Sequence, residues 1–205
     1  MIDDSFSKES LRDMHRRGVR GARVNLETVG NSDPDYARQA LIKVAAQVAD
    51  LGWHVQTYTN IGVLRRLTDT ISKLPTTLVV DHFGKPDAAL GITQPGFHEL
   101  CDLVKAGSVY VKLTAPYRIS KAENYSDVPP FAKALIRANA DRVLWGTDWP
   151  HPGAAVGHIK RGIDEITPFR DEDNLAALHR AAGWTENASD LTKLMATNAA
   201  VLYQF

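Results

Sequence analysis

Five short apolar segments alternate with stretches of helical periodicity along the chain, and this alternation constrains the fold more than any other feature of the sequence. The segments are rich in Val, Leu, Thr and aromatic residues, as β-strands are, and they cover residues 18–26, 53–59, 77–82, 109–114 and 142–148. Strands that alternate with helices pair in parallel, because each helix carries the chain back across the sheet. The sequence therefore predicts an α/β fold with a parallel sheet.

The helical stretches carry recognisable start and stop signals. Asp33 followed by Pro34 is typical of an N-cap and a first helical turn, and Gly52 lies where that helix should end. Apolar residues at helical spacing predict further helices at 8–17, 63–71, 95–107, 131–138, 175–182 and 188–202.

The strand count raises the question of whether the fold is a complete barrel. The expected strand ends lie 24 to 34 residues apart, which suits one βα unit each. A closed barrel of eight such units needs about 250 residues. The 205-residue chain is therefore expected to form a single domain over residues 1–205, either an open five-stranded sheet or a TIM barrel that lacks its first three units.

Composition excludes several classes of function. The 24 basic and 24 acidic side chains balance, so there is no basic excess to neutralise nucleic-acid phosphates or to bind an anionic membrane. No run approaches the roughly 18 apolar residues of a membrane span. A lone cysteine, Cys101, fits a reducing compartment and cannot build a thiolate metal site. With an acidic, polar N-terminus that is unlike a signal peptide, the expected location is the cytoplasm.

Polar side chains stand at or near the ends of the predicted strands: Arg23, Tyr58, His82 and Asp148. Each has a structural alternative. Arg23 could form a surface ion pair and Tyr58 could be a packed aromatic residue. His82 could be a loop or capping residue, and Asp148 could be a turn former. By strand alternation, His82 is expected on the same face as Leu78 and Val80. In parallel α/β folds the carboxyl edge of the sheet carries the chemistry, so the four residues together form a candidate site.

The strand regions, taken in order, resemble the amidohydrolase-related (amidohydrolase 2) family of TIM-barrel hydrolases. The segments that carry the resemblance are GVRGARVNL, LGWHVQTYTN, LVVDHFGKPD, VYVKLTAPYRIS and VLWGTDWPHP. The resemblance covers about residues 5 to 205, and the most similar branch is the 2-pyrone-4,6-dicarboxylate lactonase type. It implies that the five strands correspond to the fourth to eighth strands of the barrel, so that the chain looks truncated at its N-terminus. The family's His-x-His pair, which belongs to the first strand, occurs nowhere in the sequence.

The resemblance also implies roles for individual residues. Asp148 matches the eighth-strand aspartate and His82 the sixth-strand histidine, which are the catalytic pair. Arg23 and Arg118 match arginines that hold an anionic substrate, and Tyr58 matches a fifth-strand tyrosine of the lactonase branch. Lys85 replaces an arginine, and Val29 stands near the place of another arginine that is absent. A carboxylate-bearing substrate is therefore better supported than a dicarboxylate.

Lactone hydrolysis requires a base for water, polarisation of the carbonyl and an acid for the leaving oxygen. We expect Asp148 to be the base, His82 to polarise the carbonyl, and the cationic residues to bind carboxylates without a cofactor. One alternative is a metal-dependent amidohydrolase or decarboxylase with a divalent metal such as zinc, which the family binds through histidines missing here. Another is a non-catalytic truncated remnant, or a subunit that associates through its exposed sheet edge. The expected partner is a small carboxylated molecule rather than a nucleic acid or a membrane.

Overall fold

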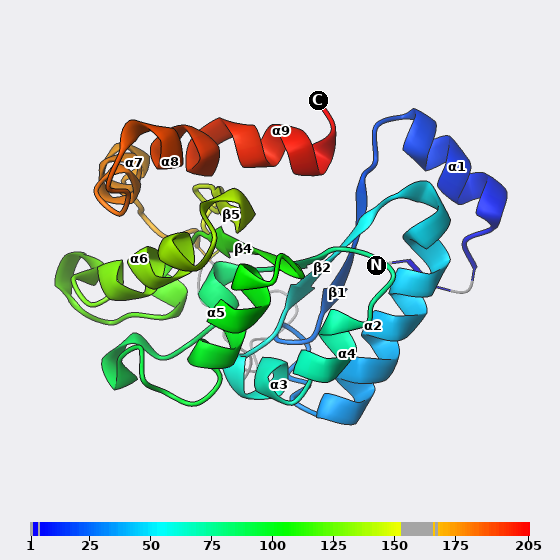
Figure 1. Ribbon diagram of the computed structural model, residues 1–205, viewed down its shortest axis with the longest axis horizontal. Coiled ribbons are helices and arrows are strands. Elements are labelled where there is room, and N and C mark those ends of the chain that lie inside the picture. Colours follow the sequence, from blue (N-terminus) through cyan, green and yellow to red (C-terminus); the bar gives the residue numbers. More distant parts are fainter. Residues whose placement is uncertain (1, 4, 153–165, 167) are drawn as a thin grey trace.

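The computed structural model describes residues 2–3, 5–152, 166 and 168–205. Its centre is a sheet of five parallel strands that lie side by side in sequence order (Figure 1). The strands are β1 (Gly21–Asn25), β2 (His54–Tyr58), β3 (Leu78–Val80), β4 (Val109–Leu113) and β5 (Val143–Trp145). Within the described residues, β1 and β5 each pair with one neighbour, so the sheet is open. The predicted α/β fold of successive parallel units is confirmed.

Helices follow the strands as the periodicity predicts. Their bounds are α1 (Lys8–Arg16), α2 (Pro34–Val48), α3 (Ile61–Arg65), α4 (Thr68–Ser72), α5 (Phe97–Lys105), α6 (Pro129–Ala138), α7 (Asn174–Ala182), α8 (Ala188–Thr192) and α9 (Asn198–Tyr203). A π-helical turn, Lys193–Thr197, joins α8 to α9. The single helix expected at 188–202 is therefore a continuous helical segment with a widened turn in its middle.

Helix α2 shows how the sequence sets its own boundaries. The Asp33 side chain accepts a hydrogen bond from the backbone N–H of Asp35, and Pro34 occupies the first turn, where a missing N–H has no consequence. Apolar side chains at helical spacing, including Leu41 and Val48, are fully buried against the sheet. Gly52 ends the following turn with a left-handed φ of 65°.

One helix expected from the sequence is two helices in the structure. The apolar stripe at 63–71 predicted a continuous helix, but the chain turns more tightly between α3 and α4. There the Leu67 N–H bonds to the Leu64 carbonyl, three residues back, and the next bond runs from Ile71 to Leu67. The side chains of Leu64, Leu67 and Ile71 all remain buried. The apolar pattern therefore predicted the burial correctly but not the break in the helix.

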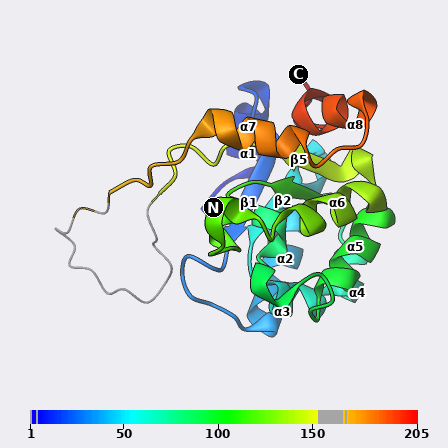
Figure 2. The ribbon, with the colours of Figure 1, turned by 90° about the vertical axis from the view of Figure 1, so that its left-hand side faces the viewer.

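The sheet has two faces with different coverings (Figures 1 and 2). Alternate strand residues such as Leu78 and Val80 pack into the main core with the crossover helices. On the opposite face, Val79, Tyr110 and Leu144 form a smaller cluster against Ala199 and Leu202 of α9. Tyr203 contacts His54 at the start of β2, so α9 covers this inner face toward the amino ends of the strands. The carboxyl ends remain open and carry the polar residues described below.

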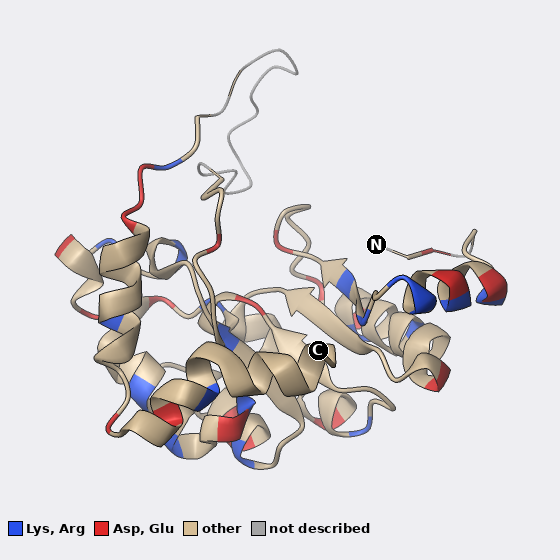
Figure 3. Cartoon of the chain, turned by 90° about the horizontal axis from the view of Figure 1, so that it is seen from above, with Lys and Arg blue, Asp and Glu red and all other residues tan. Residues whose placement is uncertain are grey.

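The surface charges are mixed. Basic and acidic residues both occur along outer helices such as α1 (Figure 3). Within the described ranges, no helix is both long and apolar enough to cross a membrane.

Candidate active site

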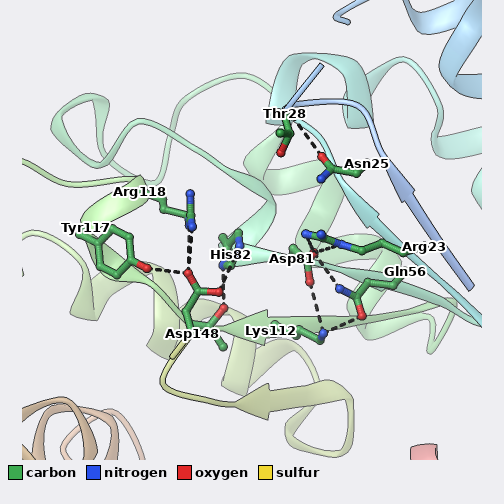
Figure 4. Close-up of polar contacts among 11 residues, drawn as sticks. Arg23, Asn25, Thr28, Gln56, Asp81, His82, Lys112, Tyr117, Arg118 and Asp148 are labelled. Carbon is green, nitrogen blue, oxygen red and sulfur yellow. Dashed lines mark hydrogen bonds and ion pairs between the residues drawn. The ribbon is translucent and has the colours of Figure 1, made fainter. Parts of the chain in front are cut away.

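Two adjoining cavities lie at the carboxyl edge of the sheet. The first, of about 420 Å³, is lined by residues that include Asp81, His82 and Asp148. The second, of about 520 Å³, is lined by residues that include Tyr58 and Arg118. Because Arg118 and Asp148 are bonded to each other, the cavities meet at this pair (Figure 4).

Asp148 follows β5 and is held by two donors from the loop after β4. Its Oδ2 accepts a hydrogen bond of 2.6 Å from the Tyr117 hydroxyl. The same oxygen accepts bonds of 3.0 and 3.2 Å from Arg118 Nη2 and Nε. Burial alone would raise the pKa of Asp148, but the hydrogen bond from Tyr117 and the positive charge of Arg118 outweigh it and hold the pKa below its usual value. Asp148 is therefore ionised at neutral pH.

His82 reaches the first cavity by a route that strand alternation did not predict. The expectation that it shares a face with Leu78 and Val80 is wrong, because those residues pack into the helix-covered core. Strand β3 ends at Val80, and the backbone of His82 is left-handed, with a φ of 51°, which turns the side chain toward Asp148. The distance from His82 Nε2 to Asp148 Oδ1 is 3.9 Å, too long for a hydrogen bond.

The state of the His82 ring follows from its surroundings. Its Nδ1 lies 2.8 Å from the Thr114 hydroxyl, inside the protein. Burial lowers the pKa of His82 to about 4, so the ring is neutral at neutral pH. A neutral imidazole carries one proton, and a hydroxyl that donates to Nδ1 leaves that proton on Nε2, which faces the cavity.

Tyr58 lines the second cavity and packs against His82 of the first. Its ring packs edge-on against His82 with a centroid separation of 4.9 Å, and the Arg118 guanidinium lies 5.6 Å from its ring centre. Burial raises the pKa of Tyr58, which keeps the hydroxyl protonated and able to donate a hydrogen bond.

Arg23 lies in a polar network that the sequence analysis missed. Asp81, only 2% exposed, accepts bonds from Arg23 Nη2 at 2.9 Å and from Gln56 Nε2 at 2.9 Å. Lys112 donates to Gln56 Oε1 at 2.7 Å and lies 3.4 Å from Asp81 (Figure 4). Alternation along β3 and β4 could have found this network, since Asp81 shares a face with Val79, and Lys112 is a charged residue within an apolar strand.

Lys85 lies in the wall of the second cavity, where it forms an ion pair with Glu27. Burial and the nearby positive charge of Arg118 lower the pKa of Lys85. The structure thus brings Arg23, His82 and Asp148 to the lining of one cavity and Tyr58, Lys85 and Arg118 to that of the next. Tyr117, which makes the shortest hydrogen bond to Asp148, was also missed, although it directly precedes Arg118.

A metal site would need more ligands than the described residues bring together. Among the described residues, no group of three or more His, Cys, Asp or Glu side chains is arranged to hold a metal ion. A catalytic zinc site uses three protein ligands, whereas His82 and Asp148 supply two. These residues by themselves do not fit a zinc centre.

The first cavity therefore combines an ionised carboxylate and a neutral imidazole, and the second supplies positive charge and a phenol. A carboxylate can take a proton from water, and a neutral imidazole N–H can donate to a carbonyl oxygen. The cationic wall suits an anionic group on the same ligand.

The chain is similar in sequence to curated hydrolases. The chain is 39% identical over 162 residues to a 2-pyrone-4,6-dicarboxylate hydrolase from Comamonas testosteroni, covering 74% of this chain and 52% of that protein. It is 34% identical over 145 residues to a 4-sulfomuconolactone hydrolase from Hydrogenophaga intermedia, covering 70% of this chain and 47% of that protein. The chain spans about half the length of these curated relatives.

A solved structure shows the same architecture. A protein from Pseudomonas putida, described as a candidate 2-pyrone-4,6-dicarboxylic acid hydrolase, superposes with a TM-score of 0.78 at 28% identity. The match covers all of this chain and 70% of that one. The family model described as Amidohydrolase (Amidohydro_2) matches residues 1–205. The chain therefore belongs to the Amidohydrolase (Amidohydro_2) family.

Proposed function

We propose that this chain carries the site of a hydrolase for carboxylate-bearing lactones, in which Asp148 activates water without a metal. The observation that carries the proposal is Asp148 itself, an ionised carboxylate bonded to Arg118 and facing a neutral His82 across one cavity. The relatives named as hydrolases of a pyrone dicarboxylate and of a sulfomuconolactone support the lactone as the substrate class.

The chemistry assigned to the site is as follows. Asp148 takes a proton from water while the oxygen attacks the lactone carbonyl carbon. His82 donates its Nε2 proton in a hydrogen bond to the carbonyl oxygen, where negative charge develops. When the ring C–O bond breaks, Asp148 returns its proton to the leaving oxygen, and the product is an open-chain hydroxy acid.

Substrate binding and the basicity of Asp148 are coupled in this scheme. Arg118 binds the substrate carboxylate from the second cavity, Tyr58 adds a hydrogen bond, and Lys85 and Arg23 contribute positive charge. When the guanidinium turns toward the substrate, Asp148 loses a partner that lowers its pKa. The carboxylate then becomes a stronger base once the substrate is in place.

The role of metal is tested by elemental analysis and by chelation. We expect no stoichiometric zinc in the purified protein, because two ligands form too weak a site. Hydrolysis of a panel of carboxylated lactones by a form extended by the first three βα units of a relative should persist in a chelator, whereas the 205-residue chain alone should show little or no activity. The extended form should be the more active, because the resemblance places a further His pair there.

A different outcome would favour the metal-dependent alternative. One tightly held metal per chain that is lost in Asp148→Asn, or activity that returns only with added zinc, would contradict metal-free catalysis. Full activity of the 205-residue chain would show that the additional units are dispensable.

The pH dependence gives a separate prediction. Asp148 must be ionised to act as a base, so activity falls as the pH drops through its pKa. The hydrogen bond from Tyr117 lowers that pKa, so Tyr117→Phe should raise it and move the acidic limb of the kcat/KM profile to higher pH. Tyr110→Phe is the control, since Tyr110 packs in the inner-face cluster away from Asp148. An acidic limb that stays in place would show that Asp148 does not set it.

A further inference from the structure

Glu27, which forms an ion pair with Lys85, has no part in the chemistry proposed above. Glu27 follows β1, and its backbone N–H donates to the Tyr58 carbonyl at 3.0 Å. Lys85 has a left-handed φ of 51°, and its N–H donates to the His82 carbonyl at 2.8 Å. Both side chains are about four-fifths buried, with 21% and 23% of their surfaces exposed. The pair is therefore fixed by the same backbone segments that hold Tyr58 and His82.

The pair controls the charge of the second cavity. Lys85 and Arg118 both line it and are close enough for the charge of Arg118 to lower the pKa of Lys85. Glu27 supplies the opposite charge beside Lys85, which leaves Arg118 as the inner cation that an anion can reach by displacing Asp148. Lys121 also lines the cavity, but it is exposed, so water screens its charge. Arg170 is paired with Glu172.

We propose that Glu27 is a specificity-determining residue, which makes the site selective for lactones with one carboxylate over lactones with two. This inference rests on the proposed function, because it concerns the substrate of that same site. It contrasts with the dicarboxylate in the name of the Comamonas testosteroni relative.

The selectivity follows from the charges. A first carboxylate binds Arg118. A second carboxylate that reaches Lys85 meets the carboxylate of Glu27, and two like charges in a partly buried site repel each other. To make room, Glu27 would have to leave Lys85 and remain largely buried without a partner, which is also unfavourable. A neutral ring substituent meets neither penalty.

The test compares two flat acids that differ by one carboxylate, benzoate and benzene-1,3-dicarboxylate, by calorimetric titration of the 205-residue chain. Wild type should bind benzoate at least as tightly as the dicarboxylate. In Glu27→Gln the amide keeps the shape but removes the charge, so affinity for the dicarboxylate should rise about tenfold or more. Benzoate affinity should change by about twofold or less, because its carboxylate lies on Arg118.

Two further variants sharpen the test. Glu186→Gln is the matched control, since Glu186 is likewise in an ion pair, with Arg137, but on the exposed surface. It should leave both affinities unchanged, which separates the local effect from net charge. Lys85→Met leaves Glu27 without its partner and should weaken the dicarboxylate further while benzoate still binds. A thermal melt of each variant will show whether it is folded. If Glu27→Gln does not fold, the affinities of Lys85→Met for the two acids test the proposal instead.

The inference is overturned if Glu27→Gln tightens both acids equally, if neither affinity changes, or if neither acid binds any variant. These binding experiments require no turnover. A selectivity shift without any lactone hydrolysis would therefore contradict the proposed function alone, and hydrolysis without the shift would contradict the role of Glu27 alone.

Discussion

Replacing Asp148 with asparagine is expected to lower kcat for lactone hydrolysis by about a thousandfold, within the range that general-base catalysis contributes. The amide has nearly the same shape as the carboxylate but cannot accept a proton from water. Substrate binding should remain largely intact, because the cations that hold the substrate carboxylate are still present.

The measurement is steady-state hydrolysis by the form extended by three βα units, with substrate affinity determined separately by titration. Asp141→Asn is the matched control, because Asp141 is also ion-paired, to Lys193, but lies on the exposed surface. Normal turnover by Asp148→Asn would return Asp148 to the role of a turn residue held by Tyr117 and Arg118.

Arg118→Met is expected to act mainly on binding and to raise KM by about a hundredfold, as loss of one partner from a buried charge pair commonly does. A carboxylate clamp stabilises the ground state and the transition state alike, so kcat should change much less. Removing the guanidinium also removes one cause of the lowered pKa of Asp148, so the acidic limb should move to higher pH.

The comparison for Arg118 is Arg137→Met, which removes an exposed arginine that pairs with Glu186. It should leave KM unchanged. If Arg118→Met lowers kcat while KM stays constant, then Arg118 acts in the transition state and not as a carboxylate clamp.

The fold was largely predictable because its signals are local. A short apolar run that must be buried on both faces reads as a parallel strand, and Asp33 with Pro34 marks a helix start through bonds to its own neighbours. The break between α3 and α4 was not predictable in this way. Both sides of the break present apolar residues to the same core, so the hydrophobic pattern is unchanged by the tighter turn at Leu67.

The site was predictable in part. Sequence position placed Tyr58, His82 and Asp148 near the carboxyl ends of their strands, and the order of the strands brought those ends together. The partners were harder to predict because they depend on register and on loop conformation. Arg23 faces Gln56 through the register of β1 and β2, and both bond to Asp81, which directly follows β3.

Backbone conformation decides the remaining cases. His82 and Asp148 both have a left-handed φ, at 51° and 64°, which is uncommon for residues other than glycine. Strand alternation assumes extended backbone, so it placed His82 on the wrong face. Such conformations are set by the surrounding loop and not by the residue itself, which is why the sequence pattern did not reveal them.

The most direct test of the central claim is a single-turnover reaction of a carboxylated lactone in ¹⁸O-labelled water, with the extended form and a chelator present. Attack by water activated by Asp148 predicts an open hydroxy acid with one ¹⁸O atom in its new carboxyl group. A rearranged lactone without label, or conversion that occurs only after zinc is added, would contradict metal-free hydrolysis at this site.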